Sequence, residues 1–293
     1  MGSASLIRAP DVPVFARYGF LLATLSLVAG LISGPGYRLG LWSLGIGFGI
    51  LRWACYLAVI AALLSLTGTV VSQARGAKRG ITLGIAGVLL GVATFAWPAV
   101  MLFRARQVPP IHDITTDTVD PPRFVAILPL RADAANPTEY GGPDIAAQQR
   151  KAYPRIGPSQ SKLAPDQAFE RALTAARDMG WTIVAAVPPE GRIEATATTL
   201  FYGFKDDIVV RVKAVGVGNG SRIDVRSESR VGKSDIGMNA RRVEAFLKRI
   251  ETSSSLPVSR YQPLGAGWML STQCTSSGLG STLDKSRLTT TGS

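Results

Sequence analysis

The stretch ITLGIAGVLLGVATFAWPAVMLF, residues 81–103, contains no Asp, Glu, Lys, Arg or His. A helix needs about 20 consecutive apolar residues to cross the hydrocarbon core of a bilayer, so this stretch predicts a membrane span. Two more uncharged runs precede it, at residues 53–72 and 18–33, and the second approaches that length when residues 14–16 are added. We therefore predict a transmembrane region over residues 1–107, with spans at about 14–33, 53–72 and 81–103. A cleaved signal peptide remains the alternative for the first run.

The distribution of charge agrees with this division of the chain. The 293 residues carry a formal net charge of +12, although only 18% of them are charged. Residues 1–106 hold 9 Lys and Arg against 1 acid, a charge of +8, and residues 107–293 hold 23 against 19, a charge of +4. Most of the excess lies in the apolar third, where basic residues set membrane topology. We therefore predict that the protein does not bind nucleic acid.

The basic residues around the three runs predict an orientation. With the N-terminus inside, the cytoplasmic side receives five of them and the other side receives four. We therefore predict a multi-pass protein of the bacterial inner (plasma) membrane whose C-terminal domain is extracytoplasmic, that is, periplasmic. The five are Arg8, Arg17, Arg75, Lys78 and Arg79, and the four are Arg38, Arg52, Arg104 and Arg106.

Small residues recur at helical spacing in the predicted spans. Gly80, Gly84, Gly87 and Gly91 form one stripe, and small residues on one face let membrane helices approach closely. We expect a compact three-helix bundle, and a homo-oligomer formed through such a stripe is an additional prediction. The uncharged runs at 18–33, 53–72 and 81–103 contain no Asp, Glu, Lys, Arg or His, which argues against a transporter or pump. Arg52 follows the apolar stretch 39–51, which we expect at the membrane interface, so that Arg52 opens the second span.

A small domain is predicted after residue 107. Residues 108–163 are rich in proline and are expected to form a linker and an irregular segment. The helical spacing of Phe169, Leu173 and Ala176 predicts a helix that ends near Gly180. Alternating apolar residues then predict strands at 181–186 and 192–199, a third through residues 208–212, and a fourth that begins near residue 223. A last helix covers residues 243–250.

The predicted fold class is therefore α+β. An N-terminal three-helix transmembrane bundle is followed by a small domain, residues 164–251, with a four-stranded antiparallel sheet covered on its apolar face by two helices. Residues 252–293 hold 17 Ser or Thr and are predicted to form a disordered tail.

The fourth predicted strand carries charges of alternating sign at every second residue. Such a pattern is typical of a solvated sheet face with cross-strand ion pairs, and the third strand can supply the opposing charges. Binding of an anionic headgroup or glycan is the alternative use of this face. The charged residues are Arg222, Asp224, Arg226, Glu228 and Arg230 on the fourth strand, with Asp207, Arg211 and Lys213 on the third.

Three carboxylates are candidates for acid–base chemistry. Asp206 and Asp207 are adjacent, but neighbours in a strand point to opposite faces, so they can cooperate only in a turn. Asp235 or Ser234 is placed to cap the last helix. The same helix start is the best candidate for a ligand site and is suited to an anion; the basic residues nearby are Arg230, Lys233, Arg241 and Arg242. The candidate ligand or partner surface comprises Arg226, Ser229, Arg230, Ser234, Asp235, Asn239, Asp206 and Asp207.

No complete catalytic, metal or cofactor motif is present. His112 is the only histidine, and no GxSxG elbow accompanies it. The two cysteines are Cys55, in a predicted span, and Cys274, in the predicted tail. Gly216, Gly218 and Gly220 superficially resemble a phosphate-binding loop, but the lysine of that motif and the helix that follows it are missing. We therefore predict no catalytic residue, no metal site and no cofactor.

Two runs carry a resemblance to a known family. RIEATATTLFYGFKDDIVVRV, residues 192–212, and SRIDVRSESRVGKSDIGMNARRVEAFL, residues 221–247, closely resemble the domain-of-unknown-function 1499 family of bacteria. PPIHDITTDTVDPPRF, residues 109–124, is similar to the segment that precedes that domain in its membrane-anchored members. The resemblance covers roughly residues 108–250. It implies that GFxDD at 203–207 and SRVGxSDxGxN at 229–239 are family features, and it carries over no catalytic residues.

These observations favour a non-enzymatic membrane protein that presents its domain to a partner in the cell envelope, either a protein or a lipid. The alternative is a membrane-tethered enzyme that acts on an envelope lipid or glycan through Asp206, Asp207 or Asp235. The lipid bilayer is a partner in both cases.

Overall fold

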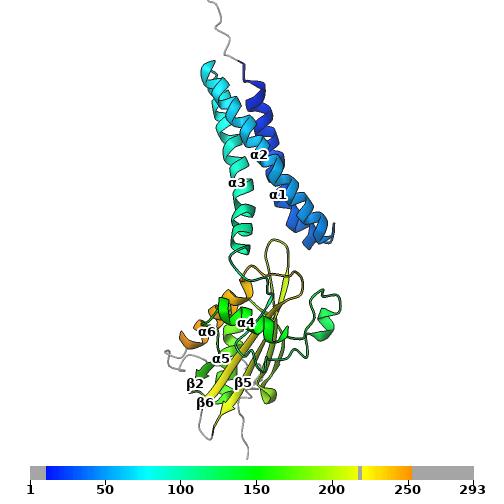
Figure 1. The fold of residues 1–293 in the computed structure, drawn as a ribbon, viewed down its shortest axis with the longest axis vertical. Coiled ribbons are helices and arrows are strands. Elements are labelled where there is room, and N and C mark those ends of the chain that lie inside the picture. The colour runs from blue at the N-terminus through cyan, green and yellow to red at the C-terminus, as the bar shows by residue number, and fades with distance from the viewer. Residues whose placement is uncertain (1–10, 217–219, 253–293) are drawn as a thin grey trace, which may run out of the picture. The chain divides into compact units, whose positions relative to one another are not determined.

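The computed structural model describes residues 11–216 and 220–252. The predicted tail beyond residue 252, with Cys274, and the centre of the glycine loop at Gly218 lie outside the described residues. Three long helices come first along the chain, and a domain of strands and shorter helices follows them (Figure 1).

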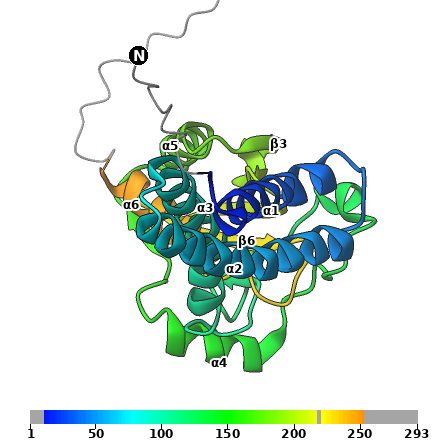
Figure 2. The ribbon, with the colours of Figure 1, turned by 90° about the horizontal axis from the view of Figure 1, so that it is seen from above.

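The three predicted spans are helices α1 (Val14–Arg38), α2 (Leu44–Ala74) and α3 (Lys78–Ala105). Each is long and apolar enough to cross a membrane. Each contacts the other two, and Figure 2 shows them side by side in end view. Their buried residues are almost all Gly, Ala, Ser or Thr, whereas many of their large apolar side chains are exposed. This arrangement suits helices that are surrounded by lipid.

The glycine stripe of α3 lies inside the bundle. A Cβ atom on Gly91 would lie 2.7 Å from the carbonyl oxygen of Ala58, and one on Gly84 would lie 2.8 Å from that of Ser65. These glycines therefore allow α3 to contact the backbone of α2 directly. The described helices form the predicted bundle, and oligomerisation remains a prediction.

Helix α2 begins earlier than the sequence predicts. The hydroxyl of Ser43 accepts a hydrogen bond from the backbone N–H of Ile46 at 3.4 Å, and the helix starts at Leu44. Residues 44–51 are therefore its first turns, and Arg52 lies within the helix rather than at its start. Of the glycines in these turns, Gly47 serves packing, because a Cβ on it would lie 2.9 Å from the carbonyl oxygen of Ser33.

The domain contains a six-stranded sheet, which corrects the prediction of four strands. The strand order is β1-β6-β5-β4-β3, β2 also pairs with β6, and every pairing is antiparallel. The two strands that were not predicted have three residues each, too few for an alternating pattern to be recognised. The strands are β1 (Asp113–Thr115), β2 (Ser159–Ser161), β3 (Thr182–Val187), β4 (Arg192–Thr198), β5 (Lys205–Val215) and β6 (Gly220–Ser229).

Two helices cover one face of the sheet, as predicted. Helix α5 (Pro165–Asp178) contacts β3, β4, β5 and β6, and α6 (Met238–Thr252) contacts β1 and β6 (Figure 1). The core between the helices and the sheet includes Phe169, Ile208 and Val225. The ring of Trp181 stacks on that of Phe246, with 5.3 Å between their centres.

A hairpin joins β3 and β4 at residues 188–191, where Pro188, Pro189 and Gly191 in the sequence favour a turn. The short 3-10 helix η2 (Pro188–Glu190) joins the two strands, and Gly191 then adopts a positive φ of 61°. Glycine adopts this conformation without the strain that a Cβ atom would cause.

The proline-rich segment 108–163 is part of the folded domain. It supplies β1, β2, the 3-10 helix η1 (Leu128–Arg131) and helix α4 (Gly142–Ala152). Gln149 of α4 covers the edge of β1, because its side chain accepts from the backbone N–H of Thr115 at 3.0 Å and donates to the carbonyl of the same residue at 2.7 Å. Residues 117–140, here named the strap, cross the face opposite α5 and α6, where Phe124 and Ile127 pack on Val209.

Candidate functional site

The strand face with alternating charges is buried, which corrects the prediction of a solvated face. The register of β5 and β6 places Arg211 opposite Asp224, a pair of opposite charge as expected, but it places Asp207 opposite Glu228, a pair of like charge. However, Asp207 and Asp224 are fully buried, Glu228 is 1% exposed and Arg226 is 2% exposed. The strap covers these side chains. A buried charge is tolerated when an opposite charge and hydrogen bonds compensate it, and this face supplies both.

Arg226 of β6 joins the sheet to β1 and to the strap. Its guanidinium donates to both carboxylate oxygens of Asp113, at 2.9 and 2.8 Å, and to Glu228 at 3.3 Å. It also donates to the carbonyl oxygen of Thr138 in the strap, at 2.8 Å. The guanidinium carbon lies 4.9 Å from the centre of the Phe124 ring, in cation–π contact. Arg226 therefore acts as an internal crosslink.

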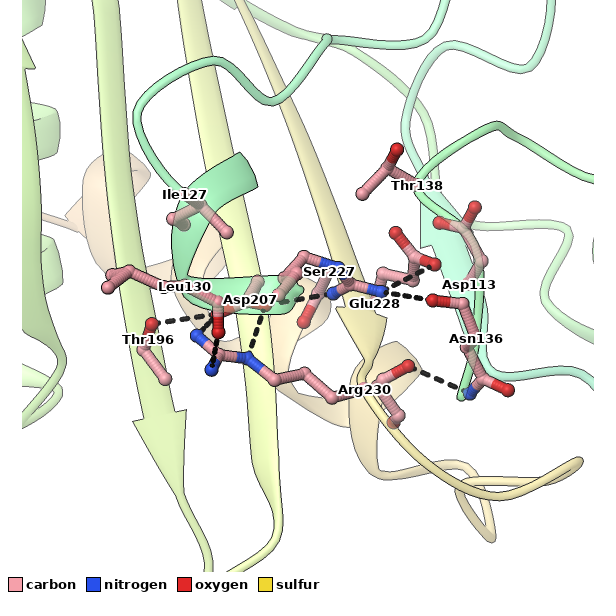
Figure 3. A network of polar contacts seen from close by, with 12 residues as sticks. Asp113, Ile127, Leu130, Asn136, Thr138, Thr196, Asp207, Ser227, Glu228 and Arg230 are labelled. Carbon is pink, nitrogen blue, oxygen red and sulfur yellow. Dashed lines mark hydrogen bonds and ion pairs between the residues drawn. The ribbon is translucent and has the colours of Figure 1, made fainter. Parts of the chain in front are cut away.

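A second group of arginines holds η1 against the strands. The carboxylate of Asp207 accepts from Arg131 at 2.8 Å, from Arg230 at 2.8 and 2.9 Å, and from the hydroxyl of Thr196 at 2.7 Å. Figure 3 shows Arg230 and Thr196 directed at Asp207 and η1 lying across the strands. Arg131 also donates to Glu228 at 3.0 Å. Because a carboxylate accepts about four hydrogen bonds, Asp207 is fully used in this structure.

Glu194 of β4 binds the backbone at the start of η1. Its carboxylate accepts from the consecutive backbone N–H groups of Val125, Ala126 and Ile127, at 2.9–3.1 Å, and it forms an ion pair with Arg192. Glu194 is fully buried. These N–H groups have no partner within a regular helix or strand, so the carboxylate satisfies donors that would otherwise be buried unpaired. Sequence analysis missed this residue because a single glutamate in a strand carries no distinguishing pattern.

Ion pairs also hold the beginning of the strap, at the other end of the charged face. Asp117 accepts from Arg222 at 2.7 Å and from Arg211 at 3.1 Å. Both arginines also donate to Asp224, at 3.0 Å. Ion pairs therefore fix the strap along the length of the charged face.

Burial changes the acidity of two carboxyl groups in this network. Burial, together with the neighbouring carboxylates of Asp113 and Asp207, raises the pKa of Glu228 to about 8, although Arg226 and Arg131 act in the opposite direction. Burial also raises the pKa of Asp113, against the effect of Arg226. Glu228 is therefore mostly protonated at neutral pH and has a pKa in the range that suits a general acid or base.

Access to Glu228 nevertheless argues against catalysis. Its side chain is 1% exposed, and its two oxygens accept from Arg131 and Arg226 respectively. A substrate could reach it only if the strap moved away from the sheet. Within residues 11–216 and 220–252, no group of three His, Cys, Asp or Glu side chains is arranged to hold a metal ion.

Asp206 lies on the opposite face from Asp207, as strand geometry predicts. It accepts from Arg242 of α6 at 2.6 Å. Asn239 donates to the hydroxyl of Ser229 at 2.9 Å and accepts from that of Ser227 at 2.7 Å, and Arg242 donates to Ser227 at 3.0 Å. These polar side chains satisfy one another between β6 and α6, so they hold the helix on the sheet.

Asp235 caps α6, as predicted. Its carboxylate accepts from the backbone N–H groups of Gly237 at 2.8 Å and Asn239 at 2.5 Å. Burial raises the pKa of Asp235, and these two bonds act against the rise. Ser234 accepts from the backbone N–H of Ile236 at 3.3 Å. Both residues therefore order the turn that precedes the helix.

The predicted anion site at this helix start lacks two of its cations. Arg230 binds Asp207 and Arg242 binds Asp206, in ion pairs inside the domain. Arg241 donates to the carbonyl of Ile236 at 3.1 Å. Of the candidate surface residues, the structure thus brings Arg226, Arg230 and Asp207 together under the strap, and Asp206, Ser229 and Asn239 together under α6.

A contact that sequence analysis missed joins the β4–β5 loop, residues 199–204, to the membrane helices. The Phe201 ring lies edge-on to the Trp97 ring of α3, 5.4 Å between centres, and the Tyr202 ring lies 5.0 Å from that of Phe48 in α2. The cluster of aromatic residues in this loop was the available signal, because aromatic side chains concentrate at membrane interfaces.

Comparison with known proteins agrees with the resemblance seen in the sequence. Residues 113–250 match the family described as protein of unknown function, DUF1499, which confirms that prediction. The match begins at β1 and therefore includes the strap as well as the strands and helices. No curated protein matches the chain.

Proposed function

We propose that this chain, whose residues 113–250 form a DUF1499 domain, is a binding or structural module of the bacterial cell envelope without catalytic activity. Three apolar helices anchor it, and we propose that they lie in the inner membrane with the domain on the periplasmic side.

The use of the carboxylates supports a non-enzymatic role. Asp206 and Asp207 point to opposite faces and are paired with arginines, and Asp235 caps a helix. An enzyme that used these groups would need them to converge on a space open to substrate. This is the observation that carries the proposal.

The outer surface of the strap is the binding surface that we propose. Val125, Leu128 and Leu130 are 45–54% exposed. The backbone N–H of Leu128 bonds to the carbonyl of Val125 at 3.4 Å, and this turn brings the two residues close together at the start of η1. Exposed apolar side chains that cluster on a rigid support are typical of a protein–protein interface. This surface replaces the charged sheet face, which lies beneath the strap.

Site-specific photocrosslinking in intact cells tests this surface. A benzoylphenylalanine at Leu128 should give a discrete crosslinked partner, and the double variant Leu128→Ser, Leu130→Ser should lose that partner while keeping the melting midpoint of the wild type. Val119→Ser is the matched control, because Val119 is an exposed apolar residue of the same strap, 92% exposed, outside η1. A partner retained by the double variant, or none detected at residue 128, would count against the proposal.

The orientation is tested separately with reporter fusions. Alkaline phosphatase fused after residue 110 should be active, because the enzyme folds only outside the cytoplasm. An inactive fusion, together with an active cytoplasmic reporter at the same position, would reverse the proposed topology.

A further inference from the structure

A cavity of about 270 Å³ lies where the β4–β5 loop contacts the membrane helices. Because all three helices can cross a bilayer, the ligands available to this cavity are the molecules of the bilayer itself. Its walls include Leu27 and Leu31 of α1, Leu51 of α2, Trp97 and Pro98 of α3, and Phe201 of the loop.

The lining of the cavity suits a hydrocarbon chain. Thr94 also contributes to the wall, but its hydroxyl donates to the carbonyl of Leu90 at 2.8 Å and is therefore satisfied. A cavity without unpaired polar groups does not hold ordered water. At roughly 30 Å³ for each water-sized group, the volume accommodates about nine such groups in a row. That is the size of a segment of an acyl chain and too small for a lipid headgroup with its chain.

Gly30 keeps part of this space open. A Cβ atom on Gly30 would lie 3.7 Å from its nearest neighbour, a methyl group of Thr94. At Gly91 the same atom would lie 2.7 Å from the carbonyl of Ala58, so that glycine is required for helix contact. A Cβ on Gly30 meets only ordinary van der Waals contacts with Thr94 and Ala54, so we expect a larger side chain there to take up cavity space.

Positive charge lies two helical turns from the cavity on two of its walls. Arg38 follows Leu31 by seven residues in α1, and Arg104 follows Trp97 by seven residues in α3. Seven residues make about two turns, so each arginine lies on the same side of its helix as the cavity residue, about 10 Å further along the axis. Both arginines are exposed. Basic residues at a membrane surface attract anionic lipids by about 1 kcal/mol each.

We propose that this cavity binds one acyl chain of an anionic phospholipid, with the lipid phosphate near Arg38 and Arg104. Phe201 covers the chain on the side of the domain, where its ring also contacts the backbone of α1 at Gly34. The lipid thus lies between the membrane helices and the β4–β5 loop. The proposal does not depend on the partner proposed for the strap, which concerns another part of the chain.

Native mass spectrometry of the full-length protein tests the proposal. The protein is purified in mild detergent after reconstitution with phosphatidylglycerol or with phosphatidylcholine, and bound lipid is counted. We expect one retained phosphatidylglycerol per chain and at least tenfold less in Gly30→Leu. Leu25→Phe adds bulk to an exposed position of α1 outside the cavity and should retain lipid as the wild type does. Arg104→Gln should reduce the preference for phosphatidylglycerol over phosphatidylcholine.

Three results would overturn the proposal. The first is equal lipid retention by the wild type and Gly30→Leu. The second is a lipid-free dimer whose subunits close the cavity for each other. The third is equal retention of the two lipids by the wild type, which would remove the role of the arginines. Circular dichroism confirms that each variant folds, and Ala93→Leu, at an exposed position in the cavity wall, replaces Gly30→Leu if that variant does not.

Discussion

Replacement of Arg226 by methionine tests whether the charged face holds the strap in place. Methionine keeps much of the length of the side chain but provides no charge and no donor. The substitution removes the bidentate pair with Asp113, the bond to Glu228 and the bond to the strap carbonyl of Thr138. Asp113 then remains buried without its main partner, because its carboxylate is only 6% exposed.

The expected cost follows from that burial. Removal of one partner from a buried ion pair costs about 3–5 kcal/mol, since the remaining charge is left uncompensated. Part of the cost at Glu228 is avoided because this residue, with a pKa of about 8, is already mostly protonated at neutral pH. Asp113 therefore accounts for most of the loss. If the strap opens locally, its opening free energy falls by the same amount, and amide exchange accelerates about 150- to 4,000-fold.

Hydrogen exchange measured by mass spectrometry on the full-length protein in nanodiscs provides the assay. The informative amides are those of residues 125–127, which donate to Glu194. Arg222→Met is the matched control on the same face of β6. Its side chain is 34% exposed, and Arg211 still binds Asp224 when it is removed. The control should change exchange less than about fivefold, as expected for a partly exposed ion pair worth up to about 1 kcal/mol.

An equal change in the exchange of residues 125–127 in both variants would refute a special role for Arg226. A change of less than about fivefold in Arg226→Met would also refute it. Equal changes would mean that the buried pair of Arg226 holds the strap no better than the partly exposed pair of Arg222, and a small change in Arg226→Met would mean that the apolar contacts of the strap are sufficient to hold it.

Three further predictions concern other parts of the structure. Burial raises the pKa of Glu228 to about 8, so its contribution to stability is complete below the ordinary glutamate pKa of about 4.3 and is lost as pH rises through 8. Glu228→Gln should therefore reduce the fall of the melting midpoint between pH 5 and 9. An unchanged dependence of the midpoint on pH would contradict this prediction. Glu194→Gln should cost about 1–3 kcal/mol, because the amide cannot satisfy all three N–H groups, and exchange at residues 125–127 should rise while that of α6 stays constant. Gly91→Ala should lower the melting midpoint in detergent, because its Cβ would lie 2.7 Å from the carbonyl oxygen of Ala58. Gly30→Ala should leave the midpoint unchanged, because its Cβ would lie 3.7 Å from its nearest neighbour. Equal midpoints in the two variants would contradict the role of Gly91 in helix packing.

Local patterns were sufficient for much of the architecture. The uncharged runs predicted three spanning helices, a hairpin turn predicted β3 and β4, and alternating apolar residues predicted β5 and β6. The capping role of Asp235 and the opposite directions of Asp206 and Asp207 also follow from sequence. Each of these properties depends on residues within a few positions of one another or on the fixed geometry of a strand.

The environment of the charged strand face depended on the tertiary structure. Alternation shows that Arg226 and Glu228 share a face, but it does not show what covers that face. The segment that covers it, the strap, is rich in proline, and its apolar residues show no regular spacing. Side-chain contacts hold this segment in place, and regular backbone pairing does not. The partner of Arg226 is Asp113, which is 113 positions away in the sequence.

The distinction has a single physical reason. Helices and strands are encoded by interactions between near neighbours, so their pattern is written in the sequence. The burial of a charge is decided by whether distant groups of opposite charge meet it with the correct geometry. For this protein, the sequence alone determined the three long apolar helices and the four longer strands, whereas the register of the strands came from the structure. Only the tertiary structure decided that the charged face is an internal joint and that a lipid-sized cavity lies beside the β4–β5 loop.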